Sequence, residues 1–252
     1  MGHTGTLDPF ATGLLVVLLG RATRIAQFVP TEPKTYEAAI SFGHETTTDD
    51  ALGEMRCESG APDMGRIATG IEQLTGDIQQ LPPEYSAKKV GGTRAYAAAR
   101  RGAPLQLQPV CVHVFGWSIQ RFVEGTLYAT ISCGSGTYVR ALARDLGRLT
   151  GSAAHLSALR RTRAGPFDVA EATTMDALTG GAFAVRPAHE ALANLPFERL
   201  TEEAERAVRH GRAIPAQVAG DRAALLDQQG RLLAIANRKS ELWQPSVVLV
   251  DA

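Results

Sequence analysis

One stretch near the start of the sequence leaves the backbone few conformations, namely Gly2-His-Thr-Gly-Thr-Leu-Asp-Pro9. Its glycines permit tight turns, whereas Pro9 removes a backbone donor and fixes the chain directly after Asp8. A loop of this kind can hold one carboxylate over a cleft, and the apolar run at residues 14–19 predicts a buried strand after it. The residues alone leave a second interpretation open, in which Asp8 only caps its own turn.

The charges of the chain are balanced in sum but not along the sequence. The 252 residues carry 26 Lys and Arg against 26 Asp and Glu, and a neutral sum argues against a nucleic-acid partner. Residues 32–85, however, hold 3 basic and 11 acidic residues, whereas residues 86–163 hold 12 basic and 2 acidic ones. The neutral sum therefore does not argue against a nucleic-acid partner, because residues 86–163 can form a localised basic face. The zero total predicts only weaker non-specific binding to bulk nucleic acid than a uniformly basic protein would show.

Several function classes find no support in the sequence. The longest apolar run, residues 14–19, is far shorter than the roughly 20 residues that span a bilayer, so we expect no membrane association. Cys57, Cys111 and Cys133 lack metal-ligand spacing, which predicts reduced, buried thiols and no metal site. Motifs for phosphate loops, dinucleotides and serine nucleophiles are missing, which predicts a reaction without a cofactor.

Hydrophobic patterning predicts an α+β chain with two domains, at residues 1–190 and 195–252. Tyr36, Ala38, Ile40 and Phe42 alternate on one face of a predicted strand at 34–43, whereas the polar, acidic segment 44–53 indicates a loop. The other predicted strands are 110–122, 126–133, 155–167 and 247–250, and the predicted helices are 22–29, 67–74, 93–101, 138–149 and 202–210.

The first motif, extended to Leu15, resembles the catalytic motif of the TruB family of tRNA pseudouridine synthases. Further matching segments follow in the family's order: Lys34-Thr-Tyr36, Pro82-Pro-Glu-Tyr-Ser-Ala-Lys88, Gly136-Thr-Tyr-Val-Arg140 and Leu159-Arg-Arg-Thr162. The resemblance covers residues 2–167. It implies the pseudouridine synthase fold, a mixed, mainly antiparallel central sheet flanked by helices, with a small β-rich C-terminal domain that is PUA-like.

The family isomerises one uridine in the T loop of tRNA, at position 55, to pseudouridine. The C–N glycosidic bond breaks, and the base, flipped out of its loop, turns and rejoins the ribose through carbon. The resemblance implies a tRNA T stem-loop as substrate, no cofactor, and an aspartate that attacks the ribose, the base or the product of ribose deprotonation. It also implies a cytoplasmic monomer. Phe10-Ala-Thr-Gly-Leu14 and the short C-terminal segment look bacterial, which implies an enzyme that needs no guide RNA.

The matching positions carry over the family's roles. Asp8 matches the nucleophile, Arg140 the arginine that pairs with it and keeps it ionised, and Tyr36 the tyrosine that stacks on the target base. The resemblance further implies His3, Tyr138 and Leu159 around the flipped base, with Lys88, Arg160 and Arg161 as phosphate contacts. Each of these residues also has a simpler interpretation as a core, turn or solvated side chain. We expect Asp49 and Asp50 in a solvated loop that binds no metal.

The sequence departs from the family at one point. Members have a strand and a Lys-Pro-x-Gly-x-Thr-Ser segment before the catalytic motif, whereas this sequence starts at the motif. Loss of that segment would expose a sheet edge and apolar surface. An alternative function is therefore a catalytically impaired module that binds or folds tRNA, and a third is a guide-RNA-dependent synthase. Asp8, Tyr36 and Arg140 favour the first interpretation, an enzyme.

We expect the 252-residue chain to be poorly stable and weakly active beside a version extended upstream, because the catalytic loop would lack a packing partner. Expressing both versions and comparing their melting temperatures and turnover tests this expectation. Equal values for the two versions would contradict it.

Overall fold

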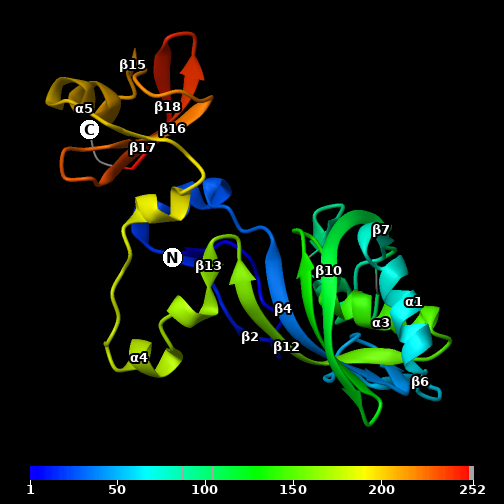
Figure 1. Cartoon of the computed structure of the whole chain (residues 1–252). Coiled ribbons are helices and arrows are strands. Elements are labelled where there is room, and N and C mark those ends of the chain that lie inside the picture. Colours follow the sequence, from blue (N-terminus) through cyan, green and yellow to red (C-terminus); the bar gives the residue numbers. More distant parts are fainter. Residues whose placement is uncertain (87, 104, 250–252) are drawn as a thin grey trace. The chain divides into compact units, whose positions relative to one another are not determined.

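The computed structural model describes residues 1–86, 88–103 and 105–249 (Figure 1). The chain forms two compact units, which are described separately below. The larger unit holds Leu7–Leu14 and Thr31–Glu171, and the smaller unit holds Met1–Thr6, Leu15–Pro30 and Ala172–Ala252. Because the two units alternate along the chain, the domain boundaries expected from the sequence stay a prediction.

The larger unit is built on one sheet. In spatial order its strands are β13 (Phe167–Asp168), β12 (Ala154–Ala164), β4 (Lys34–Phe42), β11 (Thr126–Cys133), β10 (Val110–Val123) and β7 (Gly76–Gln80), with β2 (Thr12–Gly13) beside β12. Neighbouring strands are antiparallel except for β2 and β12, which run parallel. The predicted α+β class with a mainly antiparallel central sheet is confirmed.

Side-chain alternation explains the central strand of this sheet. Tyr36, Ala38, Ile40 and Phe42 of β4 all lie on the buried face, as the sequence predicts. They pack in one core with the buried residues of β11 and β12. A strand with one apolar face is held in register by that burial, because a slip of one residue would turn the whole face to solvent.

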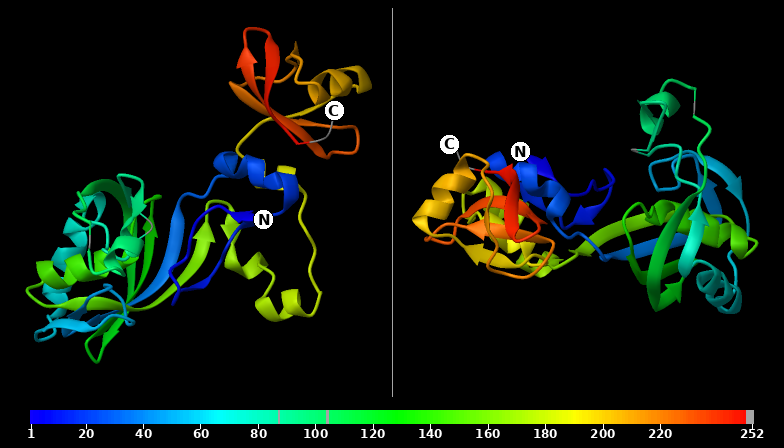
Figure 2. Two further views of the ribbon diagram at one scale, coloured as in Figure 1. Left: turned by 180° about the vertical axis from the view of Figure 1, so that it is seen from behind. Right: turned by 90° about the horizontal axis from the view of Figure 1, so that it is seen from above.

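Two helices, α1 (Met64–Gln73) and α3 (Val139–Leu149), contribute their apolar faces to this core (Figures 1 and 2). Asp63 caps α1 by accepting a hydrogen bond of 2.9 Å from the backbone N–H of Arg66. Gly70 lets the helices meet closely, since a Cβ there would lie 2.8 Å from Leu146 Cδ1. The shorter elements are β5 (His44–Thr46), β6 (Met55–Glu58), β8 (Lys89–Val90), β9 (Thr93–Arg94), α2 (Ala95–Ala99) and η2 (Val169–Glu171).

The smaller unit has a sheet of its own, with strands in the order β14 (Phe197–Arg199), β16 (Arg222–Leu226), β17 (Leu232–Lys239), β18 (Leu242–Val248) and β15 (Ile214–Pro215). α5 (Glu202–Arg209) packs on it, and buried Trp243 donates from Nε1 to Glu198 Oε2 at 2.7 Å. The unit also holds β1 (Gly2–His3), β3 (Val17–Leu18), η1 (Gly20–Phe28), α4 (Met175–Thr179) and η3 (Ala188–Leu192). The predicted β-rich C-terminal region is confirmed.

Two local predictions about burial are wrong. Residues 14–19 do not form a buried strand: β3 pairs only two residues with β1, and Leu15, Val17 and Leu19 are exposed. Apolar composition alone does not bury a strand that lacks a long partner. Of the three thiols only Cys133 is buried, because Cys57 and Cys111 lie on the exposed faces of β6 and β10.

The longest α-helix of the described residues is α3, with 11 residues. No helix within the described ranges has both the length and the apolarity needed to cross a membrane.

Two leucines of α3 give a matched test of the core. Leu146→Ala should lower the free energy of unfolding by about 2–5 kcal/mol, because Leu146 is fully buried beside Gly70. Leu149→Ala, on the same helix, should change it by less than about 0.5 kcal/mol, because Leu149 is 45% exposed. Urea unfolding followed by circular dichroism measures both. Equal losses would contradict this packing.

Candidate active site

Asp8 and Arg140 form a bidentate ion pair. Asp8 lies in the loop before β2, and Arg140 lies in the first turn of α3. Arg140 donates from Nε to Asp8 Oδ2 at 2.9 Å and from Nη2 to Asp8 Oδ1 at 2.7 Å. The Arg140 side chain is 4% exposed, whereas that of Asp8 is 27% exposed. The pair therefore fixes the carboxylate from its buried side and leaves its other side accessible.

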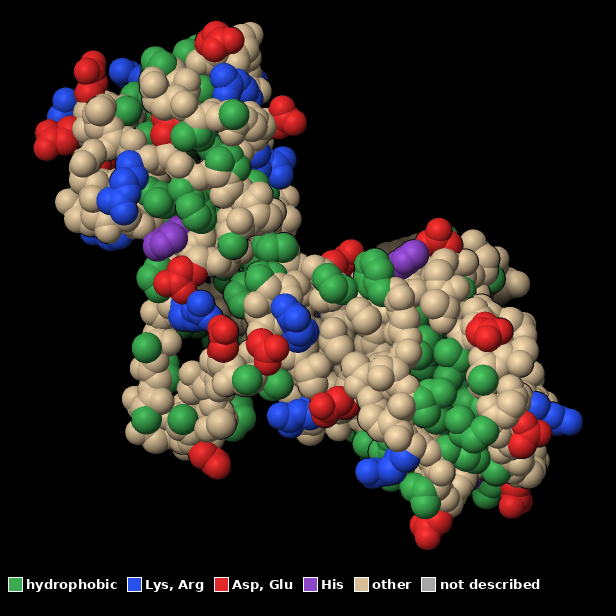
Figure 3. Space-filling view, in the orientation of Figure 1, with side chains coloured by type: hydrophobic (Ala, Val, Ile, Leu, Met, Phe, Trp, Pro, Cys, Tyr) green, Lys and Arg blue, Asp and Glu red, His purple; other side chains and the backbone are tan. Residues whose placement is uncertain are grey.

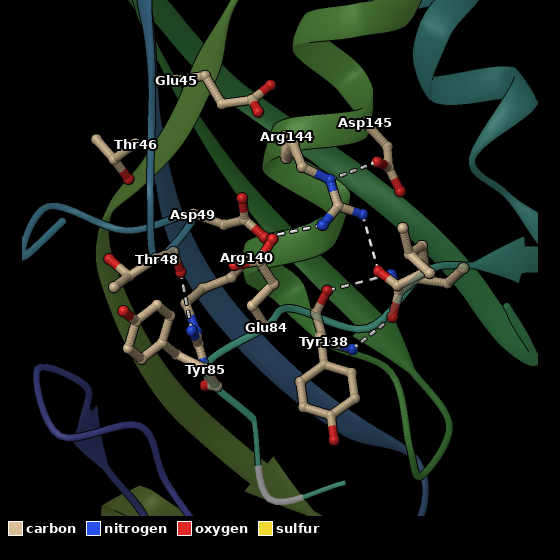
Figure 4. A network of polar contacts seen from close by, with 12 residues as sticks. Glu45, Thr46, Thr48, Asp49, Glu84, Tyr85, Tyr138, Arg140, Arg144 and Asp145 are labelled. Atoms are coloured by element: carbon tan, nitrogen blue, oxygen red, sulfur yellow. Dashed lines mark hydrogen bonds and ion pairs between the residues drawn. The ribbon is translucent and has the colours of Figure 1, made fainter. Parts of the chain in front are cut away.

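Three further groups converge on the Arg140 guanidinium, and Figure 4 shows two of the residues that supply them, Thr48 and Tyr85. Nη1 donates to Thr48 O at 2.9 Å, Nη2 donates to Tyr85 O at 3.1 Å, and an Asp50 carboxylate oxygen lies 3.5 Å from Nη1. Asp50 is itself held by the Thr48 hydroxyl at 2.6 Å and the Leu52 N–H at 3.0 Å. Separate chain segments thus satisfy the buried charge, which would otherwise be costly to desolvate.

The start of α3 is positioned by Gln80 at the end of β7. The Tyr138 N–H donates to Gln80 Oε1 at 2.8 Å, and Gln80 Nε2 donates to Tyr138 O at 3.2 Å. Gln80 is fully buried, so these bonds are shielded from water. The Tyr138 ring points away from Arg144 (Figure 4). By fixing the backbone of Tyr138, Gln80 therefore positions Arg140, which follows Tyr138 by two residues and binds Asp8.

The loop that carries Asp8 is tied to β12 at its other end. The Leu14 N–H donates to Arg161 O at 2.8 Å, and Arg161 Nε donates back to Leu14 O at 2.8 Å. Gly13 has a φ of 96°, and a Cβ there would lie 2.2 Å from Arg161 O. Only glycine permits both this backbone conformation and this close approach.

Tyr36 lies on β4 close to the ion pair. Burial raises the pKa of its hydroxyl, the negative charge of Asp8 adds to the rise, and a hydrogen bond from Arg161 opposes it. The phenol is therefore protonated at neutral pH. The structure thus joins Asp8 and Arg140 directly, and it links Tyr36 to the loop that carries Asp8 through Arg161.

The predicted RNA-contacting residues lie in several places. Leu159 is buried in the core of the larger unit. Lys88 and Arg160 are exposed, and Arg160 Nε lies 3.9 Å from the Glu37 carboxylate. His3 is exposed on β1 of the smaller unit.

Arg161 differs most from its predicted place as a phosphate contact. It is 2% exposed, and its guanidinium bonds to Leu14 O and to the Tyr36 side chain. Successive residues of a strand point to opposite faces, so Arg161 turns inward where Arg160 points outward. Arg161 therefore links the loop that carries Asp8 to Tyr36.

The sequence does not reveal a second buried ion pair, in which Arg144 Nη1 lies 2.9 Å from Asp49 Oδ2 (Figure 4). The prediction of a solvated loop at residues 44–53 is wrong, because Glu45, Asp49 and Asp50 are buried. Burial raises the pKa of Asp49 to about 6, although the positive charge of Arg144 acts against the rise. A signal was present in α3, where arginines recur every four residues at 140, 144 and 148.

Other charged side chains give no sign of a metal centre or of one continuous basic field. Across the described part of the chain, no three His, Cys, Asp or Glu side chains are arranged to hold a metal ion. On the face drawn in Figure 3, Lys and Arg side chains alternate with Asp and Glu. On this face, basic and acidic side chains are therefore interspersed and do not form separate patches.

Gly13 allows a direct test of how the loop at residues 7–14 is docked. Gly13→Ala should loosen it, because the new Cβ would collide with Arg161 O. Amide hydrogen exchange of this loop should then speed up. Gly76→Ala is the matched control, since Gly76 has a similar φ of 85° but nothing within 4 Å of a Cβ. Faster exchange of the loop in both variants would mean that a general loss of stability, and not the close approach at Gly13, is responsible.

Two family models match the chain: TruB family pseudouridylate synthase (N terminal domain) over residues 1–139, and tRNA pseudouridylate synthase B C-terminal domain over residues 140–201. The chain is 44% identical to tRNA pseudouridine synthase B of Thermobifida fusca (strain YX), over 100% of this chain and 89% of that protein. It is 42% identical to tRNA pseudouridine synthase B of Nocardia farcinica (strain IFM 10152), over 99% and 84%.

Among solved structures, the crystal structure of a Cbf5-Nop10-Gar1 complex matches in fold. The TM-score is 0.69 at 24% identity, and the match covers 99% of this chain and 76% of the other. With a family model over more than half of its length and relatives above 40% identity along nearly all of it, the chain belongs to the TruB family of pseudouridylate synthases.

Proposed function

We propose that this chain is a tRNA pseudouridine synthase that converts the uridine at position 55, in the T loop of tRNA, to pseudouridine. It acts in the cytoplasm as a monomer on the T stem-loop, without guide RNA or cofactor. The relatives named tRNA pseudouridine synthase B support the tRNA substrate, since they are similar along nearly the whole chain.

The observation that carries this proposal is the Asp8–Arg140 pair. A carboxylate nucleophile must be ionised, oriented and accessible. Arg140 supplies one hydrogen bond to each Asp8 oxygen, which leaves further lone pairs on both. The Asp8 side chain also keeps 27% of its surface exposed, so a ribose or base can reach it.

The proposed reaction is an isomerisation. The bond between C1′ of the ribose and N1 of the uracil breaks, the base turns, and its C5 bonds to C1′. C5 loses its proton and N1 gains one, so no atom or electron is lost overall. Asp8 attacks the ribose, the base or the product of ribose deprotonation. A carboxylate bonded to C1′ leaves as C5 bonds there, whereas one bonded to the base is eliminated after the new bond has formed.

The roles of the other site residues follow from the family resemblance and are part of the proposal. Tyr36, buried beside Asp8, stacks on the flipped uracil, and Leu159 supplies an apolar contact below it. Tyr138 lies beside the flipped base, and the exposed Lys88 and Arg160 contact phosphates. We assign His3 to the space that the flipped base leaves in the RNA loop. Flipping is required because a base stacked in a structured loop is out of reach.

Asp8→Asn should abolish pseudouridine formation in an isolated T-arm hairpin while leaving hairpin binding intact. Asparagine keeps the shape of the side chain but loses its charge and its nucleophilic oxygen. Tritium released from uridine labelled at C5 reports turnover, because C5 loses its hydrogen as it bonds to C1′. Filter retention of the labelled hairpin reports binding.

Asp168→Asn is the matched control, because Asp168 is an exposed carboxylate of the same unit that lies 3.9 Å from Arg163. This variant should keep full turnover. Binding without turnover in the unaltered chain would instead support a tRNA-binding module. Turnover that persists in Asp8→Asn would overturn the role of the aspartate.

A further inference from the structure

α3 carries a second buried arginine one helical turn after Arg140. The Arg144 side chain is 6% exposed, and each part of its guanidinium has a partner. Nη1 donates to Asp49 Oδ2 at 2.9 Å, Nη2 donates to Leu81 O at 2.8 Å, and Nε donates to Asp145 Oδ1 at 2.9 Å (Figure 4). All three guanidinium nitrogens of Arg144 therefore donate hydrogen bonds, as those of Arg140 do. None of the hydrogen bonds that the structure gives joins Arg144 to Asp8.

The partners of Arg144 belong to the same two segments that bind Arg140. Asp49 stands between Thr48, whose carbonyl accepts from Arg140, and Asp50, whose carboxylate faces it. Leu81 begins the segment that ends at Tyr85, whose carbonyl also accepts from Arg140. The two prolines between them restrict the backbone, so fixing Leu81 also limits where Tyr85 can lie.

The backbone of Asp49 shows why this residue matters for its neighbours. Its φ is 60°, in the left-handed region that few residues other than glycine adopt. The conformation is held on both sides, since the Asp49 N–H donates to Thr46 O at 3.3 Å and Asp49 O accepts from the Leu156 N–H at 3.0 Å. This turn lets adjacent residues point in different ways, with the Asp49 carboxylate on Arg144 and the Asp50 carboxylate on Arg140.

We propose that Arg144 and Asp49 form a positioning pair that sets the orientation of Arg140, and through it that of Asp8. The pair binds the turn at residues 48–50 and the segment at residues 81–85. It thereby keeps their carbonyl and carboxylate groups oriented toward the Arg140 guanidinium. This inference rests on the proposed function and adds two residues to the site that do not touch the substrate.

The pair also makes activity sensitive to pH. The charges that act on Asp49 are those of Arg140, Arg144 and Arg148 of α3 and of Glu45 of β5. Asp50 follows it in the chain, Asp145 shares Arg144 with it, and His155 precedes Leu156, whose N–H donates to the Asp49 carbonyl. Burial raises the pKa of Asp49 to about 6, and the charge of Glu45 contributes to the rise. Below that pH the carboxyl is neutral, the attraction to Arg144 is lost, and the rate of pseudouridine formation should fall.

The effect of this group on stability has the opposite sign. Because its pKa is raised above the ordinary 3.8, the folded chain binds this proton at a higher pH than the unfolded chain does. As far as Asp49 is concerned, the fold therefore gains stability as the pH falls through this range. A loss of rate below about pH 6 without a loss of melting temperature is the expected signature.

The main test is Asp49→Asn, because asparagine tolerates a positive φ and keeps one oxygen for Arg144. At pH 7.5 the single-turnover rate on the T-arm hairpin should drop about tenfold or more, as expected when a catalytic group is misplaced, with the Kd for the hairpin unchanged. Its rate should then stay flat across pH 5–7, where the unaltered chain declines. Arg144→Lys, which keeps the charge but loses the fork, should show the same drop in rate.

Glu45→Gln is the matched control. Glu45 is buried like Asp49 and pairs with an arginine of the same helix, Arg148, but it touches none of the groups that bind Arg140. This variant should keep the rate at pH 7.5. Because the negative charge of Glu45 raises the pKa of Asp49, its removal should also shift the decline in rate to lower pH.

The outcomes separate the possible errors. If Asp49→Asn and Arg144→Lys lower the melting temperature but keep the rate and its pH dependence, the pair is structural and the inference is wrong. If Glu45→Gln loses rate to the same extent, the effect is general to buried carboxylates and the inference is also wrong. If the unaltered chain binds the hairpin but forms no pseudouridine, the proposed function fails, and the inference fails with it.

Discussion

The rest of the site depends on the ion pair and the hydrogen bonds of the buried Arg140 guanidinium. A charge removed from water costs several kcal/mol unless it is paired and hydrogen-bonded. Arg140 meets this requirement with Asp8, the turn that contains Thr48 and Asp50, and the carbonyl of Tyr85. None of these partners lies in a long strand or helix. One charge on a rigid helix therefore organises loops that apolar packing alone would leave without a fixed place.

The same logic explains the uneven charge along the sequence. Several acidic residues of the segment 32–85 pair with arginines of the segment 86–163, and the pairs are Asp50–Arg140, Asp49–Arg144, Glu45–Arg148 and Glu37–Arg160. The pairs of Arg140 and Arg144 are buried, so this part of the basic excess is neutralised inside the fold, whereas the Arg160 pair lies at the surface. The local basic face expected from the sequence stays a prediction, and it can draw only on exposed residues such as Lys88. A count of charge by segment therefore overstates how many basic side chains a ligand can reach.

How far the sequence predicts the structure depends on whether the signal is local. The alternation in β4 and the apolar face of α3 are periodic, so a short window reveals them. Asp8, Tyr36 and Arg140 could be named because long motifs carry them. The burial of Asp49 and the inward turn of Arg161 could not, because each depends on partners about 95 and 147 residues away. A polar residue is buried only where its partner exists, and a single window does not show that partner.

The contrast in exposure across the ion pair bears on the catalytic role that we propose for Asp8. Behind Asp8 lie arginines that water hardly reaches, where electrostatic interactions are stronger than in solvent. In front, the carboxylate is open. Donors that are fixed before the substrate arrives need no reorganisation during the reaction, which is how preorganised charge lowers a barrier. A fully buried Asp8 would be as well oriented but unreachable, and an Asp8 without Arg140 would be reachable but mobile. Arg140 binds Asp8 from its buried side only, so the carboxylate is both oriented and accessible.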